Sequence, residues 1–291
     1  MKTLILKAHA KINLFLAVHN RRADGYHNLD SIMHTISLCD DVSVSLSPAD
    51  TSQIIVSCSD STIPCDESNT AHRAADAFMQ ASGLCLDVRI HIEKRIPSRA
   101  GLGGGSADAA AVLRGMNELC DLPFDIKQLC EIAATIGADV PFCISGGCAH
   151  ATGIGEILST CPPMSSELHI VAAMGAEGVS TPDAYRALAN LRAKQDAPLY
   201  KDSSTLRASL FKGDTADMLN TMHNDFEQVV LHPGHDSTKI KQVMLDCQAD
   251  GALLSGSGAA VFGIFTCPHK AENTQSILLG SGYFAKLARP V

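Results

Sequence analysis

A glycine-rich segment gives the strongest sign of chemistry in this chain of 291 residues. Four glycines stand within the five positions 101–105, and Ser106 follows them directly. Glycine lets the backbone adopt positive φ angles and approach a ligand closely. An alternating apolar run precedes the segment and a helical pattern follows it, so the free N–H groups at the helix start would face an anion. We therefore expect a phosphate site made of Gly101, Leu102, Gly103, Gly104, Gly105 and Ser106.

Two other nucleotide-binding patterns fit this segment less well. A Walker loop needs Lys followed by Ser or Thr after its last glycine, and neither pair follows here. A dinucleotide fingerprint would use Gly101, Gly103 and Ser106, but its third position is normally Gly or Ala. The acidic residue expected about twenty residues further on is matched only ambiguously, by Asp121 or Asp125.

Two charged residues lie in apolar surroundings, where a charge would act strongly. Lys11 lies in the run Ala10-Lys11-Ile12-Asn13-Leu14, where it is either held partly out of water or exposed on an edge strand. Asp139 stands between a predicted helix end at Gly137 and an apolar, strand-like run at 140–142. Because an unpaired buried carboxylate is costly, Asp139 either caps a turn or pairs with a cation such as Lys11.

The surrounding pattern predicts strands and helices in the same half of the chain. Short apolar runs at 4–6 and 12–18, and alternation at 41–46, 54–58 and 86–92, are typical of strands. Helical spacing covers 70–82, with Asn69 or Thr70 as N-cap, then a helix opened by Ser106 and another at 125–136. The fold class predicted from this order is α+β, with helices packed on one side of a sheet.

The second half is predicted to form a smaller domain. A strand at 170–174 is followed by helices at 181–194, 215–230 and 240–248. Segments 252–254 and 260–265 read as a hairpin about a Gly-Ser-Gly turn, which either is only a turn or closes against the glycine-rich segment. Gly and Pro pairs between 146 and 163 favour a passage between domains at 1–160 and 161–291.

Composition excludes several classes of function. Hydrophobic residues make up 46% of the chain, which favours a globular protein, and the net charge of -8 argues against a general nucleic-acid binder. The eleven cysteines are scattered and odd in number, so reduced thiols are expected rather than a disulfide framework. The N-terminal apolar run is too short for a signal peptide and no stretch approaches a membrane span, so we expect a cytoplasmic protein that binds no membrane.

The order of these motifs resembles that of the GHMP kinase superfamily. The resemblance is carried by the segments 10–16, 22–27, 101–110, 137–142 and 254–262, which span nearly the whole chain. The glycine-rich segment alone is shared by galactose, homoserine and mevalonate kinases. The run Arg22-Ala23-Asp24-Gly25-Tyr26-His27 is more discriminating, and it is similar to members whose substrate is a cytidine-diphosphate-linked methylerythritol.

The resemblance implies a fold and a reaction. The fold would be that of a two-domain GHMP kinase, with an N-terminal domain like ribosomal protein S5 and a C-terminal ferredoxin-like domain. The reaction would be ATP-dependent phosphorylation of the C2 hydroxyl of that substrate, in the non-mevalonate route to isoprenoid precursors. Mg²⁺ would accompany ATP, with its protein ligands unknown, and the chain would act as a monomer or a weak homodimer.

The resemblance also implies roles for individual residues. Asp139 would accept the hydroxyl proton, and Lys11 would orient Asp139 and offset developing charge. Asn69 would lie near the adenine nucleotide. The substrate would be bound by Asn13, Tyr26 and His27, with Tyr185 stacking on the cytosine unless it is simply a helix residue packed on the core.

Two departures and three rival functions stay open at this point; the second departure is Thr152, where the family commonly has arginine, and the third rival is a dinucleotide oxidoreductase. Arg99 stands where the family usually has a small or apolar residue, and it could add a phosphate contact or point to solvent. Another sugar or alcohol kinase of the superfamily is the nearest rival, although Tyr26 and His27 argue against it. A nucleotide-binding protein without turnover is the second rival, but binding alone requires neither Lys11 nor Asp139.

Overall fold

The computed structural model describes residues 1–121, 124–194 and 200–291. These residues form two compact units that interleave along the chain. The first unit comprises Met1–Ala10, Cys39–Ser98 and Gly103–Gly146, and the second comprises Lys11–Leu38, Arg99–Leu102 and Gly147–Val291. The domain ranges 1–160 and 161–291 stay a prediction.

The sheet of the first unit is built from strands in which buried and exposed residues alternate. Strands β1 (Lys2–Arg21) and β2 (His27–Pro48) each contribute residues to both units, and β3 (Gln53–Cys58) and β4 (Leu86–Glu93) belong to the first. Strand β2 pairs antiparallel with β4 from Asp41 to Pro48, and β3 runs parallel to β4. Every second residue of β4 from Leu86 is buried, as the alternation predicts. The predicted runs at 4–6 and 12–18 belong to one continuous strand, β1.

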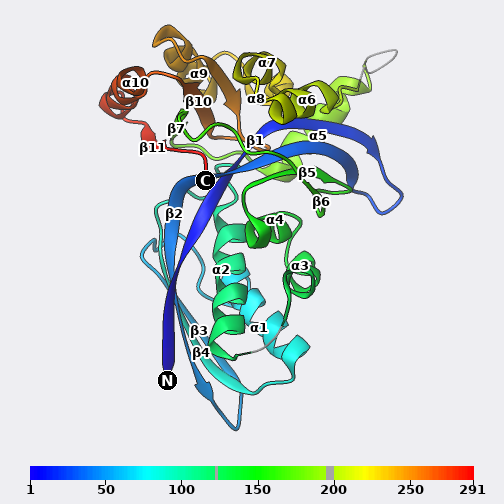
Figure 1. The fold of residues 1–291 in the computed structure, drawn as a ribbon, viewed down its shortest axis with the longest axis vertical. Coiled ribbons are helices and arrows are strands. Elements are labelled where there is room, and N and C mark those ends of the chain that lie inside the picture. Colours follow the sequence, from blue (N-terminus) through cyan, green and yellow to red (C-terminus); the bar gives the residue numbers. More distant parts are fainter. Residues whose placement is uncertain (122–123, 195–199) are drawn as a thin grey trace. The chain divides into compact units, whose positions relative to one another are not determined.

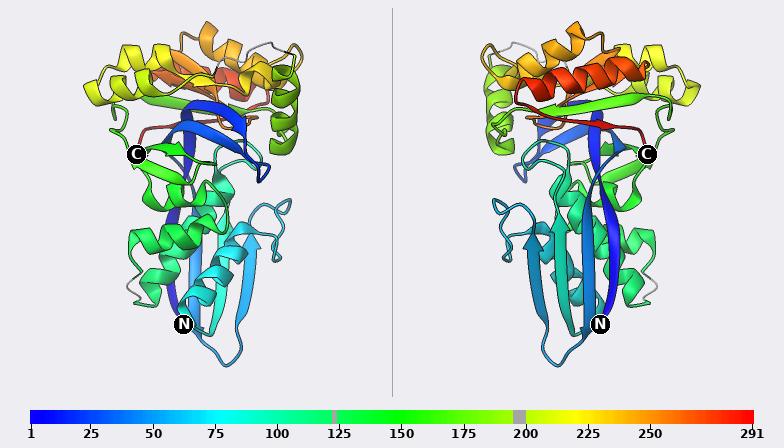
Figure 2. Two further views of the ribbon diagram at one scale, coloured as in Figure 1. Left: turned by 90° about the vertical axis from the view of Figure 1, so that its right-hand side faces the viewer. Right: turned by 90° about the vertical axis from the view of Figure 1, so that its left-hand side faces the viewer.

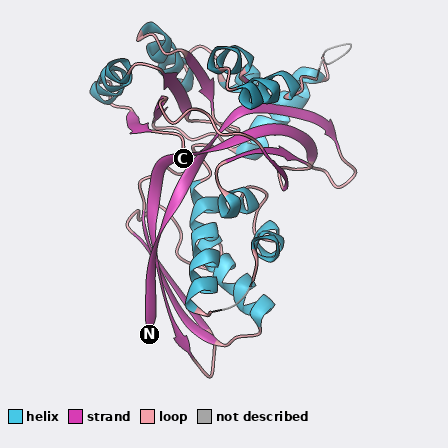
Figure 3. Ribbon diagram, viewed as in Figure 1, coloured by secondary structure: helices cyan, strands magenta, loops and turns pink. Residues whose placement is uncertain are grey.

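Helices cover one face of this sheet (Figures 1 and 3). They are α1 (Thr70–Ser82), α2 (Gly104–Leu119), α3 (Ile126–Ala134) and α4 (Val140–Ser145). The predicted N-cap of α1 is confirmed, because Asn69 Oδ1 accepts a hydrogen bond of 2.8 Å from the N–H of Ala71. Helix α2 begins at Gly104 rather than at Ser106, so two of the glycines lie within its first turn.

The strand-like interpretation of residues 140–142 is wrong. These residues open helix α4, with Pro141 in its first turn. Proline fits there because the first N–H groups of a helix have no intrahelical partner to lose. The apolar side chains of Val140 and Phe142 are buried, which is why a short helix and a buried strand look alike in sequence.

The second unit contains a four-stranded antiparallel sheet. Its order is β11 (Phe284–Ala288), β7 (His169–Met174), β10 (Val261–Phe265) and β9 (Gly251–Leu254). Strands β9 and β10 form the predicted hairpin, with Val261 opposite Leu254. Helices α9 (Asp236–Asp246) and α10 (Pro268–Gly280) pack on the sheet, and Figure 2 shows α10 lying along it. This content confirms the predicted α+β class.

Shorter elements complete the second unit. Strand β5 (Cys148–Thr152) pairs with β2 and β6 (Ile157–Thr160), and β8 (His223–Asn224) pairs with β1. The helices are α5 (Thr181–Arg192), α6 (Ser204–Lys212), α7 (Thr215–Thr221) and α8 (Glu227–Val230). The single helix predicted at 215–230 is wrong, since β8 interrupts it. No helix among the described residues has the length and apolar character needed to cross a bilayer.

Candidate active site

The start of α2 presents backbone amides from the glycine-rich segment. Gly103 precedes the helix in a left-handed conformation with φ 71°. The first intrahelical bond runs from the N–H of Ala107 to Gly103 O at 2.8 Å, so the N–H groups of Gly104, Gly105 and Ser106 precede the helical ladder. Amides in this position, at the positive end of the helix dipole, attract anions.

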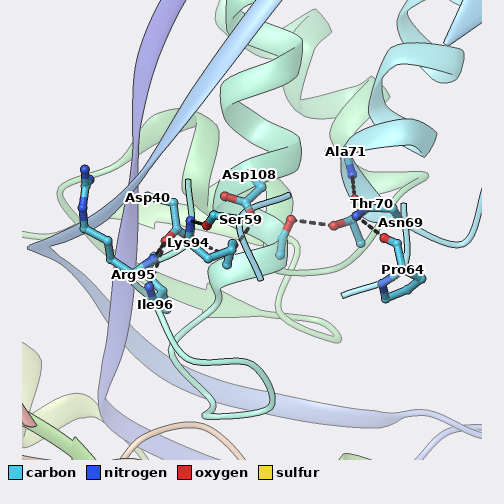
Figure 4. Close-up of polar contacts among 11 residues, drawn as sticks. Asp40, Ser59, Pro64, Asn69, Thr70, Ala71, Lys94, Arg95, Ile96 and Asp108 are labelled. Carbon is cyan, nitrogen blue, oxygen red and sulfur yellow. Dashed lines mark hydrogen bonds and ion pairs between the residues drawn. The ribbon is translucent and has the colours of Figure 1, made fainter. Parts of the chain in front are cut away.

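Neighbouring side chains leave little room for a Cβ at two of these glycines. A Cβ on Gly104 would lie 3.0 Å from Ile96 Cγ2 and 3.3 Å from Lys94 Nζ. A Cβ on Gly105 would lie 3.2 Å from Thr70 Oγ1, whose hydroxyl donates to Gly105 O at 2.8 Å. The α2 start is therefore held from two sides, by α1 and by the segment that follows β4 (Figure 4).

A buried ionic triad lies beside this helix start. Lys94 Nζ donates to Asp40 Oδ2 at 2.5 Å and to Asp108 Oδ2 at 2.8 Å, and none of the three side chains is more than 7% exposed. Asp40 Oδ1 also accepts from the N–H of Ile96 at 2.8 Å, which fixes the segment before the glycines (Figure 4). Asp108 lies in α2 itself, so the triad ties the helix to that segment.

The electrostatics of the triad follow from two carboxylates sharing one ammonium. Burial raises the pKa of Asp108 to about 7; the ammonium of Lys94 opposes this effect and the charge of Asp40 adds to it. Burial alone would lower the pKa of Lys94, but the two carboxylates outweigh burial and raise it. Asp108 therefore carries a proton in part at neutral pH, while Lys94 stays charged.

The first glycine of the segment contacts the β9–β10 turn. Gly101 adopts φ 80°, and a Cβ there would lie 2.1 Å from Ser255 O. Ser255 Oγ donates to Gly101 O at 3.0 Å. The hypothesis that the 255–258 turn closes against the glycine-rich segment is thus confirmed at Gly101. Leu102 buries its side chain and accepts the N–H of Lys11 at 2.9 Å with its carbonyl.

Lys11 is a buried lysine held by Asn13. Lys11 is 4% exposed, which excludes the interpretation as an exposed edge lysine, and its Nζ donates to Asn13 Oδ1 at 2.7 Å. Asn13 Nδ2 donates to Ser31 Oγ at 2.8 Å, and Asn13 Oδ1 also accepts the N–H of Gly256 at 3.1 Å. The same turn that contacts Gly101 therefore fixes the amide that holds Lys11.

Asp139 stands at the N-cap of α4 in the first unit. Its carbonyl accepts the N–H of Cys143 at 3.2 Å, while its side chain, half-buried, makes no capping hydrogen bond to the helix. Lys11 belongs to the second unit, and the pairing of Lys11 with Asp139 stays a prediction.

His27 and Tyr185 meet at a cavity in the second unit. Their ring centroids lie 5.2 Å apart with an interplanar angle of 29°, and the Tyr185 ring makes a T-shaped contact with Phe226, with the centroids 4.8 Å apart. The cavity, of about 140 Å³, is also lined by Arg21 and Arg192. Burial lowers the pKa of His27, and the two arginines lower it further, so the imidazole is neutral at pH 7. Tyr26 is 61% exposed.

Tyr185 accordingly fits both interpretations of its role. Its ring packs against the core residue Phe226, and it also lines the cavity, where His27 stacks on it. The side-chain amide of Asn69, by contrast, makes local hydrogen bonds. Besides capping α1, it donates from Nδ2 to Pro64 O at 2.7 Å (Figure 4). Its contact with a nucleotide stays a prediction.

Sequence reasoning missed the residues that support the site. Lys94, Asp40 and Asp108 are separated by up to 68 positions, and nothing in their spacing joins them. One signal was present: Asp108 interrupts the buried alanine-rich face of α2, where a carboxylate needs a partner. Arg192, which lines the His27 cavity and donates to Asp225 Oδ2 at 2.6 Å, was also missed. Among the described residues no group of three or more His, Cys, Asp or Glu could hold a metal ion.

Comparisons with known proteins point to one family. The model of the GHMP kinases N terminal domain matches residues 69–147. The 4-diphosphocytidyl-2-C-methyl-D-erythritol kinase of Geobacter metallireducens is 41% identical over 290 residues, 99% of each chain. The kinase of the same name from Gloeobacter violaceus is 37% identical over 280 residues, covering 96% of this chain and 91% of that protein.

Solved structures agree with this fold. A crystal structure of 4-(cytidine 5'-diphospho)-2C-methyl-D-erythritol kinase matches with a TM-score of 0.77 and 32% identity, covering 98% of this chain and 99% of that one. Homoserine kinase from Cytophaga hutchinsonii matches with a TM-score of 0.78 at 21% identity, over 100% of this chain and 96% of that one. At that identity the second match speaks for the fold alone.

Proposed function

The chain belongs to the family of 4-diphosphocytidyl-2-C-methyl-D-erythritol kinases within the GHMP kinases, and on this premise we propose that it phosphorylates the C2 hydroxyl of 4-diphosphocytidyl-2-C-methyl-D-erythritol with ATP. Identity to these relatives over nearly the whole chain carries the proposal. The C2 oxygen forms a bond to the γ-phosphorus, the bond to the β,γ-bridging oxygen breaks, and ADP leaves. The reaction also releases the hydroxyl proton, which a base must accept.

In this proposal Asp139 is that base and Lys11 offsets the negative charge that develops between nucleophile and phosphate. A base in position contributes roughly a hundred- to ten-thousand-fold in rate. Lys11 is suited to its role because Asn13 holds its ammonium in one direction at 2.7 Å. A preorganised cation in a desolvated site needs no rearrangement as charge develops.

The triphosphate would be held by the amides of Gly103, Gly104, Gly105 and Ser106. Gly101 and Leu102 would shape the backbone that the phosphates approach. Mg²⁺ prefers oxygen ligands, most of them phosphate oxygens and water, with one or two from the protein. The half-buried hydroxyl of Ser106, in the first turn of α2, is a donor of that kind, and we assign it to the ion. The ion would neutralise charge on the β- and γ-phosphates.

The cytidine end would occupy the cavity beside Tyr185. A pyrimidine ring could replace or join the His27 ring on the face of Tyr185, with Tyr26 covering it from the exposed turn. The neutral imidazole of His27 can both donate and accept a hydrogen bond, as the polar edge of cytosine requires. Asn13 would contact the polyol near the reacting hydroxyl.

A direct assay tests the proposal. The protein is incubated with ATP, Mg²⁺ and the cytidylylated diol, and the product is identified by phosphorus NMR from a new monophosphate ester resonance. Mevalonate, homoserine and galactose are assayed in parallel. Turnover of one of these three in preference to the diol would replace the proposed substrate, and no turnover of any would favour a binding protein.

Two variants test the catalytic residues against a matched control. Asp139→Asn is expected to abolish turnover while ATP binding stays nearly unchanged, and Lys11→Gln to lower kcat by at least about a hundred-fold. Lys7→Gln is the control, because Lys7 lies in the same strand but is 58% exposed and pairs with Asp41. Full activity in Asp139→Asn would remove Asp139 from the mechanism.

A further inference from the structure

Arg99 occupies a backbone conformation that glycine normally takes. Its φ is 55°, in the left-handed region, where a residue with a Cβ costs roughly 1–2 kcal/mol more than glycine. Such strain persists where the surroundings fix the backbone, and it is concentrated at functional sites. The strain by itself assigns no role to Arg99. It does call for a reason why the residue at this position is arginine rather than glycine.

The surroundings do fix the backbone next to Arg99. The carbonyl of Ala100 accepts the N–H of Ala260 at 2.8 Å, and the carbonyl of Gly101 accepts the Ser255 hydroxyl at 3.0 Å. The side chain then lies against Gly178, where an added Cβ would be 2.8 Å from Arg99 Cβ and 3.6 Å from Arg99 Cδ. The aliphatic part of the Arg99 side chain therefore lies beside Gly178, next to a backbone that is held by hydrogen bonds, while the residue as a whole is exposed.

Arg99 also lines a second cavity of the second unit. The cavity has a volume of about 230 Å³, and it is lined by Arg99, Gly101, Val179, Ser180, Thr181, Pro182 and Gly258. Among the described residues that line it, the polar side chains are one guanidinium and two hydroxyls, and none is a carboxylate. The guanidinium forms no hydrogen bond or ion pair with any residue that the structure describes. An unpaired cation among hydroxyls and glycines suits an anion with several oxygen acceptors.

Helix α5 relates this cavity to the one at Tyr185. Ser180 and Thr181 stand at its start, and Tyr185 follows Thr181 by four residues, one helical turn or about 6 Å along the axis. A ligand with a ring stacked on Tyr185 and an anionic group a few ångströms away would reach both cavities. A nucleoside diphosphate ester has that layout.

We propose that Arg99 binds the diphosphate group of the cytidylylated substrate in this cavity, together with the hydroxyls of Ser180 and Thr181. The assignment rests on the proposed function for the identity of the substrate. Thr181 Oγ1 lies 2.7 Å from Ser257 Oγ, so the hydroxyl is already oriented by the turn that contacts Gly101. The geometry makes Arg99 a binding residue for the substrate, distinct from the amides assigned to ATP.

Binding measurements with non-reactive probes test this inference. Calorimetry with CDP and with cytidine is carried out on the wild-type protein and on Arg99→Gly, Arg99→Gln and Arg99→Lys. Loss of a charged hydrogen bond is expected to weaken CDP binding roughly ten- to a hundred-fold in Arg99→Gly and Arg99→Gln. Cytidine binding should change less than about two-fold, and Arg99→Lys should recover part of the loss.

Two controls exclude a structural explanation. Arg99→Gly relieves the left-handed strain, so its melting temperature should not fall, and lost affinity then cannot come from unfolding. Arg186→Gln removes the same charge from α5, where Arg186 is exposed and pairs with Asp183 at 2.8 Å, and it should leave CDP binding unchanged. Equal CDP affinity in wild type and Arg99→Gln would overturn the proposal.

Steady-state kinetics separate this proposal from the proposed function. If the wild-type protein phosphorylates the diol and Arg99→Gln raises only KM for the diol, the assignment stands. A rise only in KM for ATP would show that the cavity binds ATP instead, and it would overturn the proposal. Absence of diol turnover in the wild type would refute the proposed function, while the CDP measurement would still decide whether Arg99 binds a diphosphate.

Discussion

Lys94 Nζ lies 2.8 Å from Asp108 Oδ2, and it joins the helix that follows the glycines to the segment that precedes them. Asp40 holds the same ammonium at 2.5 Å, so the buried cluster has two carboxylates for one cation. The second oxygen of Asp108 is buried without a hydrogen-bond partner among the described residues. A carboxylate in that position is easier to bury with a proton than without one.

The first prediction concerns the pH dependence of stability. Because burial raises the pKa of Asp108 from 3.8 to about 7, the native protein keeps a proton that the unfolded chain releases near pH 4. The contribution of Asp108 to the free energy of unfolding should fall as pH rises from 4 to 7, by at most about 1.4 kcal/mol per pH unit, and then level off. Asp108→Asn, which cannot ionise, should remove this slope.

Urea denaturation at pH 5, 6, 7 and 8 measures the effect. The stability of Asp108→Asn relative to wild type should increase between pH 5 and 7 and stay constant above. Asp121→Asn serves as control, since Asp121 is 83% exposed and its loss should give no comparable trend. A difference between Asp108→Asn and wild type that is independent of pH would show that Asp108 is ionised throughout.

The second prediction concerns the cation of the same cluster. Lys94→Met leaves two buried carboxylates without a counterion, and removing one partner of a buried ion pair typically costs about 3–5 kcal/mol. Adding Asp40→Asn and Asp108→Asn should recover part of that stability, because the uncompensated charge is gone. If the triple variant were no more stable than Lys94→Met in urea denaturation, packing rather than charge would explain the loss.

The local elements could be predicted from sequence because local interactions decide them. Strand β4 follows from its alternation, and α1 follows from its helical spacing and the cap at Asn69. The helix predicted at 215–230 failed because tertiary hydrogen bonds break it. Asn224 donates from Nδ2 to Leu254 O and to Gly256 O at 2.8 Å each, and the N–H of Asp225 donates to Leu16 O at 2.9 Å. These partners are distant in the chain, and the helical spacing of residues 215–230 does not reveal them.

The candidate site likewise has parts that local sequence predicts and parts that depend on contacts between distant residues. The glycine-rich segment stands out in the sequence because its dense glycines lie between a strand and a helix, which predicts a phosphate site, and that site stays a prediction. The hydrogen bond from Lys11 to Asn13 lies between neighbours on one strand, whereas Asp40 and Lys94 are joined across 54 residues. Only the folded chain brings that second pair together. Motifs therefore indicated the groups proposed to contact ligands, and the structure added the groups that support them.

The third prediction compares two left-handed glycines. Gly83 has φ 70° and no atom within 4 Å of an added Cβ, whereas Gly101 has φ 80° and an added Cβ would lie 2.1 Å from Ser255 O. Gly83→Ala should cost only the backbone strain, roughly 1 kcal/mol. Gly101→Ala should cost about 1–3 kcal/mol more, because the 255–258 turn must move. Thermal denaturation of both variants measures the difference, and equal losses would mean that the contact with Ser255 yields without cost.

The fourth prediction concerns the ring of Tyr185. Tyr185→Ala should weaken binding of the cytidylylated diol by about 1–3 kcal/mol, the range for losing an aromatic ring that stacks on a base. Tyr185→Phe keeps the ring and should retain most of the affinity. Because the Tyr185 ring also makes a T-shaped contact with Phe226, with the centroids 4.8 Å apart, Tyr185→Ala will lower stability as well.

Binding therefore has to be measured on folded protein, by calorimetry well below the melting temperature of each variant. ATP affinity is the internal control, since the nucleotide is proposed to bind at the α2 start, and it should be the same in all three proteins. If Tyr185→Ala bound the diol as tightly as wild type, Tyr185 would be a core residue only. If Tyr185→Phe lost as much affinity as Tyr185→Ala, the hydroxyl rather than the ring would hold the substrate.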